Sequence, residues 1–137
     1  MATLESLREI LHSTGCSCVI GNGDEVRSFH QRGIKDLYEI LHNEPTLLDG
    51  AMIADKVVGK GAMALMIAGG VKSVFADVVS EAALALANKY DTRVKYGQRA
   101  PHIINRRGDG ICPVESRCAE CDTVEECLKR IEEFLEN

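Results

Sequence analysis

The sequence predicts a single α/β domain in which helices cover both faces of a mostly parallel sheet. The chain has 137 residues and a mass of 15.0 kDa, which is too short for two dependable cores. Apolar residues make up 45% and charged residues 27%, as is ordinary for a globular protein. Short apolar runs alternate with segments of helical period, and this order requires strands joined by crossover helices.

The first third of the chain predicts a helix, a hairpin and a second helix. In order, we expect a helix at 3–13, strands at 17–20 and 25–29, and a helix at 33–42. Thr3 is a suitable N-cap for the first helix. Asn22-Gly23 is a strong hairpin signal, because both residues tolerate positive φ. Pro45 follows the second helix and ends it.

The rest of the chain repeats the alternation of strand and helix. In order, we expect a strand beginning in the apolar run 51–54, a helix at 60–68, a strand at 71–76, a helix at 80–89, a strand at 93–96, an irregular segment at 101–115 and a final helix from 123. Gly69-Gly70 ends the apolar helix, and Ser80 caps the next one. We therefore treat 1–137 as one domain, with 101–137 as a C-terminal loop and helix extension.

Charge and composition exclude several classes of partner. Sixteen basic and 21 acidic residues give a net charge of −5, which argues against binding a nucleic-acid polymer. No run reaches the roughly 20 apolar residues of a membrane span. The N-terminus lacks the basic start and long apolar region of a secretory signal, so we expect a cytoplasmic location and no membrane partner. Six cysteines in two clusters are therefore interpreted as free thiols or metal ligands.

Polar segments that follow the predicted strands are the candidate ligand sites. In an open α/β sheet, ligands bind beyond the carboxyl ends of the strands, where helix N-termini point. The first segment supplies four candidates: Asp55, Lys56, Gly59 and Lys60. Its glycines would let a ligand approach the backbone and its lysines would meet an anion, although helix packing explains the same residues equally well. The second segment supplies Ser80 and Glu81, which are more typical of an ordinary helix start.

The third segment combines basic, thiol and carboxyl groups. Asn105, Arg106 and Arg107 lie beside glycines, and the arginines could clamp a phosphate or carboxylate. Cys112 is a candidate nucleophile and Glu115 a candidate base, with Lys56 as a further catalytic candidate. A small buried Cys and a surface Glu are the simpler interpretation of the same pair. The hypothesis requires Lys60 and Arg106 to meet at one rim of the sheet.

Three stretches carry a resemblance to a known family: residues 54–62, 80–84 and 105–115. Their most specific parts are the Asp-Lys-Val-Val-Gly-Lys run that begins at Asp55 and the Cys-Pro-Val-Glu run that begins at Cys112. Together they resemble a prokaryotic family of small uncharacterised proteins with a cytidine-deaminase-like fold. The resemblance implies a three-layer α/β/α sandwich with a mixed five-stranded sheet of order 2-1-3-4-5, and it implies no reaction.

The sequence departs from the zinc-dependent deaminases of that fold. Those enzymes place His/Cys-x-Glu and Pro-Cys-x-x-Cys at two successive helix starts. The stretches in the corresponding places, 30–33 and 55–60, lack this ligand set. His42-Asn43-Glu44 matches the first pattern as a string, but it lies at the end of a helix. Zinc deamination is therefore disfavoured, and the cofactor is left open.

Four cysteines near the C-terminus offer a second metal hypothesis. They are Cys112, Cys118, Cys121 and Cys127. Four thiolates could hold a structural zinc ion, but only one CxxC pair is present. Cys127 also falls on the apolar face of the last helix, where a core role is more natural. We predict no metal site, with this cysteine set as the alternative.

These observations predict a protein that binds a nucleotide or another small phosphorylated anion on a deaminase-like scaffold. Whether it is an enzyme is left open, and any catalysis would proceed without the usual deaminase zinc. One alternative is a metal-dependent hydrolase or deaminase, or a zinc module anchored by cysteines. Another is a non-catalytic interaction protein, and a homo-oligomer is compatible with each of the three.

Overall fold

The computed structural model describes residues 3–31, 34–104, 108 and 110–136. The described residues form a five-stranded sheet in the order β2-β1-β3-β4-β5. Strands β3, β4 and β5 are parallel, and β1 pairs antiparallel with both β2 and β3. The predicted α/β class, the mixed sheet and its 2-1-3-4-5 order are therefore confirmed.

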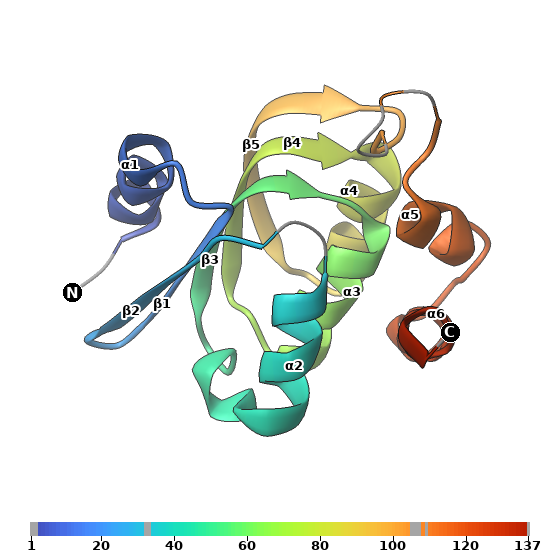
Figure 1. Ribbon diagram of the computed structural model, residues 1–137, viewed down its shortest axis with the longest axis horizontal. Helices are drawn as coiled ribbons and strands as arrows, with labels where there is room; N and C mark the ends of the chain where they lie inside the picture. Colours follow the sequence, from blue (N-terminus) through green and yellow to red (C-terminus); the bar gives the residue numbers. More distant parts are fainter. Residues whose placement is uncertain (1–2, 32–33, 105–107, 109, 137) are drawn as a thin grey trace.

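The elements follow one another along the chain in the predicted order. The strands are β1 (Cys18–Asn22), β2 (Glu25–Phe29), β3 (Met52–Val58), β4 (Ser73–Ser80) and β5 (Arg93–Ala100). The helices are α1 (Leu4–Thr14), α2 (Lys35–Asn43), the short 3-10 turn η1 (Pro45–Leu47), α3 (Lys60–Gly69), α4 (Glu81–Lys89), α5 (Pro113–Cys118) and α6 (Val124–Glu136). Figure 1 shows α1 alone on one side of the sheet and the other helices gathered on the opposite side, which confirms three layers.

Two apolar clusters correspond to the two faces of the sheet. The smaller cluster joins Leu7 and Leu11 of α1 to Val19, Ala54 and Phe75 of the sheet. The larger cluster fills the space between the sheet and the helices on the other side, and α3 lies at its centre. Residues 60–66 of α3 are all buried, as expected for a helix that is apolar nearly all round.

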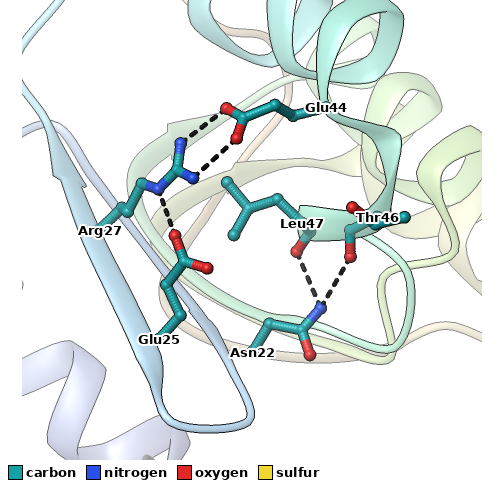
Figure 2. Close-up of polar contacts among 6 residues, drawn as sticks. All are labelled: Asn22, Glu25, Arg27, Glu44, Thr46 and Leu47. Atoms are coloured by element: carbon teal, nitrogen blue, oxygen red, sulfur yellow. Dashed lines mark hydrogen bonds and ion pairs between the residues drawn. The ribbon is translucent and has the colours of Figure 1, made fainter.

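The first hairpin turns one residue later than predicted. Asn22 belongs to β1 and pairs with Glu25 of β2, so Gly23 and Asp24 make the turn. Gly23 has φ +60°, and it is the only turn residue that needs positive φ. The Asn22 side chain instead donates hydrogen bonds to the carbonyl oxygens of Thr46 and Leu47 (Figure 2). It also donates to the carbonyl oxygen of Asp49. The Asn-Gly signal located the hairpin correctly, although Asn22 itself lies in β1 and not in the turn.

The second half of the chain differs most from the prediction. Strands β4 and β5 extend to Ser80 and Ala100, well beyond the predicted ends, because parallel pairing continues along their whole length. A helix that the sequence did not predict, α5, begins at Pro113. Buried side chains of α5 and α6, including Val114, Val124 and Ile131, belong to the main core. The C-terminal segment is therefore an integral part of the helical layer.

No helix among the described residues combines the length and apolar character needed to cross a membrane.

Candidate functional site

A cleft of about 1240 Å³ opens at the carboxyl ends of β3, β4 and β5. Asp55 and Val57 of β3, Val78 of β4 and Gln98 of β5 line it, together with residues at the start of α2 and α3. The segments 100–104 and 112–115 form another part of its wall. The cleft therefore lies at the rim where parallel α/β sheets bind ligands.

Asp55 is an ionisable residue of β3 that lines this cleft. Its Oδ1 atom accepts a hydrogen bond of 3.3 Å from the backbone N–H of Val57, and the Cys18 thiol is a second partner. Cys18 lies directly across from Asp55 in the antiparallel β1–β3 pair. Burial raises the pKa of Asp55 to about 7, and the neighbouring charge of Asp77 adds to the effect.

The two predicted lysines have different environments. Lys56 lines the cleft, is exposed, and donates a hydrogen bond of 3.2 Å to the carbonyl oxygen of Gly15. Lys60 is only 8% exposed, and its ammonium donates to the carbonyl oxygens of Ala119 and Cys121 at 3.3 and 2.5 Å. The prediction that Lys60 meets an anion is therefore not supported, because its charge stabilises the turn between α5 and α6.

Ser80 and Glu81 also lie outside the lining of the cleft. The Ser80 hydroxyl caps α4 by accepting from the Ala83 N–H at 3.1 Å, and it donates to Glu115 at 2.8 Å. Glu81 is exposed and forms an ion pair of 3.3 Å with Arg99. The simpler interpretation of these two residues, a well-capped helix start, describes them better than ligand binding.

Glu115 is buried, with 4% exposure, and joins three separate segments. Its Oε1 atom accepts from the Lys60 N–H at 2.9 Å and from the Ser80 hydroxyl at 2.8 Å. Its Oε2 atom accepts from the Ile103 N–H at 2.6 Å. These hydrogen bonds tie α5 to the starts of α3 and α4 and to the segment that carries Ile103. Such an arrangement fits a structural clamp better than the predicted general base.

The two glycines of the first segment allow α5 to approach α3. A Cβ atom at Gly61 would lie 2.3 Å from Cγ1 of Val114, and one at Gly59 would lie 3.0 Å from Cγ1 of Ile103. Both glycines also border the cleft. Close packing within the protein therefore explains why these two positions are glycine. The sequence had suggested that Gly59 lets a ligand approach the backbone.

The remaining predicted residues of the third segment are only partly described. Cys112 lines the cleft, is half-buried, and donates from its N–H to the Ile103 carbonyl oxygen at 2.8 Å. Pro113 follows it as the first residue of α5. Asn105, Arg106 and Arg107 lie outside the described residues, so their predicted clamp on an anion and the meeting of Lys60 with Arg106 stay predictions.

The four C-terminal cysteines do not assemble as one set. Cys112 borders the cleft, whereas Cys118, Cys121 and Cys127 are buried in the core between α5 and α6. Within the described part of the chain, no three His, Cys, Asp or Glu side chains are placed to hold a metal ion. The zinc module considered from the spacing therefore stays an alternative that the described geometry does not support.

Sequence reasoning missed the contact between Cys18 and Asp55 and the position of Asp36. Asp36, in the first turn of α2, lines the same cleft, and burial followed by the nearby charge of Glu39 raises its pKa. Burial raises the pKa of the Cys18 thiol well above its ordinary value, and the charge of Asp55 adds to the shift. Only the register of β1 against β3 brings Cys18 and Asp55 together, and neither residue carries a local signal of it.

A structural neighbour supports this architecture. A crystal structure of a DUF1893 family protein (TM1506) from Thermotoga maritima at 2.70 Å resolution is similar to the chain, with a TM-score of 0.86 and 26% sequence identity. The similarity covers 95% of this chain and 88% of that chain. None of the curated proteins matches the sequence.

The profile of one family matches residues 6–135, nearly the whole chain. Its description is "TM1506: Domain of unknown function (DUF1893)". The predicted resemblance to a family of uncharacterised proteins is confirmed, whereas the cytidine-deaminase-like fold stays a resemblance. The chain belongs to the DUF1893 (TM1506) family.

Proposed function

We propose that this protein binds a small phosphorylated organic anion, such as a nucleotide, in the cleft at the carboxyl ends of β3, β4 and β5. The observation that carries the proposal is Asp55, a carboxyl group that lines a large cleft and titrates near neutral pH. Perturbed acids inside a sizeable concave site are typical of binding and catalytic centres.

Asp55 can act as a hydrogen-bond donor to an anion. With a pKa of about 7, the group carries a proton at pH 6 and can donate it to a phosphoryl or carboxylate oxygen. At pH 8 it is ionised and repels the same ligand. None of the ion pairs among the described residues involves Asp55, so no cation there holds it in the charged form.

Two exposed lysines supply positive charge around the cleft. Lys56 lies next to Asp55 in β3, and Lys35 opens α2. The Lys56 ammonium has one protein acceptor, the carbonyl oxygen of Gly15, and its remaining N–H groups are available to an anion. These lysines take the place that the sequence analysis gave to Lys60.

Apolar side chains would hold the organic part of the ligand. Phe29, Ile34, Val57 and Ile104 line the cleft, and Val57 and Ile104 are 41% and 55% exposed. Exposed apolar groups inside a concave site favour a ligand with an apolar portion over an inorganic ion.

A titration at two pH values tests the proposal. We expect nucleoside monophosphates and sugar phosphates to shift amide signals of the cleft residues in NMR spectra, with weaker shifts from inorganic phosphate. Binding should be roughly tenfold tighter at pH 6 than at pH 8, the difference expected from one hydrogen bond to a charged group. Sulfate is the control ligand, because its charge is constant between pH 6 and pH 8. Any pH dependence of sulfate binding must therefore come from titration of the protein.

Matched variants identify the groups responsible. Asp55→Asn keeps a donor but cannot ionise, so it should abolish the pH dependence of binding. Asp24→Asn in the β1–β2 turn should leave the pH dependence of ligand binding unchanged. Lys56→Gln should weaken binding more than Lys72→Gln, which changes an exposed lysine outside the cleft. If no phosphorylated compound perturbs the cleft residues at either pH, the proposal is wrong.

A further inference from the structure

The two edges of the sheet differ in length and in charge. β2 forms one edge with five residues, and its Arg27 is paired with Glu25 and Glu44. β5 forms the other edge with eight residues, and among the described strands it pairs only with β4 (Figure 1). Alternate residues of β5 therefore direct their backbone N–H and C=O groups away from the sheet. β5 thus offers the longer edge to another chain.

Three basic side chains lie in one row along β5. Successive residues of a strand point to opposite faces, so Arg93, Lys95 and Arg99 share one face of the sheet. This is the face that carries α1, because Lys95 lies beside Phe75 in the β4–β5 pair and Phe75 belongs to the α1 cluster. That cluster joins α1 to β1, β3 and β4, and the three basic residues are exposed beyond it.

The positive charge of this row is only partly neutralised. None of the ion pairs among the described residues involves Arg93 or Lys95. Arg99 forms an ion pair of 3.3 Å with Glu81, but both side chains are more than half exposed, so solvent weakens the pair. β5 contains no acidic residue, although the whole chain has a net charge of −5. The edge is therefore a basic strip on an acidic protein.

We propose that β5 binds an extended, acidic peptide segment of a partner protein, which adds a strand to the sheet along this edge. The backbone of the segment would bind the outward N–H and C=O groups of β5, as in other strand additions. Acidic side chains at every second position would meet the row of basic residues. On the other face of the sheet, an apolar side chain of the segment would contact Tyr96, which is 41% exposed.

The same row of charges disfavours a second copy of this chain at the edge. In a symmetric antiparallel pair of β5 strands, the registers centred on residues 95, 96 and 97 each place two basic side chains opposite one another. Like charges directly opposite each other destabilise a strand pair. Basic residues on an edge strand therefore oppose self-association, and an acidic segment is the occupant that they favour.

Two capped peptides of the same composition test the proposal. Glu-Thr-Glu-Val-Glu-Thr-Glu alternates its acidic residues as the strand requires, whereas Glu-Glu-Thr-Val-Thr-Glu-Glu has the same charge without the alternation. We expect the alternating peptide to bind the full chain roughly tenfold more tightly in NMR titrations. Amide hydrogen exchange should slow at alternate residues of β5, because only the N–H groups on the outer edge gain an acceptor. Exchange in β2 should not change.

Matched variants separate the basic row from the general charge of the surface. Lys95→Gln should weaken binding of the alternating peptide about threefold, the loss expected for one charge pair between strands. Lys129→Gln changes an exposed lysine of α6, on the opposite side of the sheet from α1, and should leave the affinity unchanged (Figure 1).

Four results would overturn the proposal. The first is equal affinity for the two peptides, and the second is no change in exchange at β5 with either peptide. The third is an equal loss of affinity in Lys95→Gln and Lys129→Gln. The fourth is tighter binding of single-stranded oligouridylate than of the alternating peptide, which would identify β5 as a nucleic-acid surface instead.

Discussion

Two carboxyl groups at the same rim of the sheet have opposite surroundings. Glu115 accepts hydrogen bonds from Lys60, Ser80 and Ile103, which come from three different parts of the chain. Asp55 accepts from Val57 and Lys56 in its own strand and from the Cys18 thiol on the neighbouring strand. Both line the cleft, and burial raises the pKa of Asp55 to about 7.

The source of the donors explains the difference. The donors that converge on Glu115 come from distant segments, and their hydrogen bonds keep those segments together. The hydrogen bonds to Asp55 come from nearby backbone N–H groups and from the Cys18 thiol. They offset only part of the unfavourable effect of burial on the charged carboxylate. A carboxyl group of the first kind stabilises the fold, whereas one of the second kind lowers stability when ionised and is available to a ligand.

Glu115→Gln tests the structural role and should have the largest effect. The amide keeps one acceptor oxygen but directs an NH₂ group at donors that now have no acceptor. We expect a loss of about 3 kcal/mol in the free energy of unfolding, as for other broken buried charge-assisted contacts. Urea denaturation followed by circular dichroism measures it. Glu120→Gln, an exposed change nearby, should cost almost nothing, and an equal loss in both variants would contradict the comparison.

Gly61→Ala tests how closely α5 must pack to hold Glu115 in place. The new methyl group would lie 2.3 Å from Cγ1 of Val114, so α5 must move away from α3. Overpacking costs about 1–3 kcal/mol, and the better helix propensity of alanine returns up to about 1 kcal/mol. We expect a net loss of about 2 kcal/mol. A double-mutant cycle with Val114→Ala should recover part of it, and purely additive losses would exclude this packing explanation.

Asp55→Asn should stabilise the protein, in contrast to Glu115→Gln. Because the folded pKa is raised from 3.8 to about 7, the folded state binds more protons than the unfolded state between these values. Ionisation of Asp55 therefore lowers stability progressively as the pH rises through this range. The variant removes this cost, and we expect a gain of about 1 kcal/mol at pH 8, reduced by the remaining contact of the side chain with solvent.

The pH dependence of the free energy of unfolding tests whether ionisation of Asp55 lowers stability. The stabilities of wild type and Asp55→Asn should approach each other towards pH 4 and diverge towards pH 8. Asp24→Asn in the exposed turn should follow the wild-type profile throughout. A destabilised Asp55→Asn protein at pH 8 would show that the carboxylate has a structural role like that of Glu115.

The sequence allowed the fold to be predicted well because its signals are local. Alternating apolar runs, the Thr3 cap and the glycines that end helices each act over a few residues, and they located most elements. The full length of β4 and β5 depends on pairing between strands, which no local pattern records. The short helix α5 was missed because its stability comes from packing on α3 rather than from an amphipathic repeat.

The site was predicted only in part for the same reason. The rule about strand ends correctly brought Asp55, Lys56 and Cys112 to one cleft. It could not show that Lys60 turns towards the carbonyl oxygens of Ala119 and Cys121, since these lie about sixty residues further along the chain. Charge and position alone do not distinguish a cation that binds a ligand from one that neutralises buried carbonyl groups.

Arg27→Gln extends the comparison to a third carboxylate and should have the smallest effect. Arg27 donates to Glu44 through two N–H groups at 2.7 and 2.8 Å, and to Glu25 as well (Figure 2). These groups are well exposed, so solvent weakens the pairs despite their good geometry. Arg27 lowers the pKa of Glu44, so its stabilisation is present above the unfolded pKa of that group and is lost as the pH falls through the folded value.

We expect a small decrease in Tm at pH 7 and low salt, which disappears in 1 M salt and at acidic pH. Arg93→Gln on the exposed strand β5 is the matched control, and a large loss at Arg27 that persists in high salt would show that convergence of donors matters even without burial.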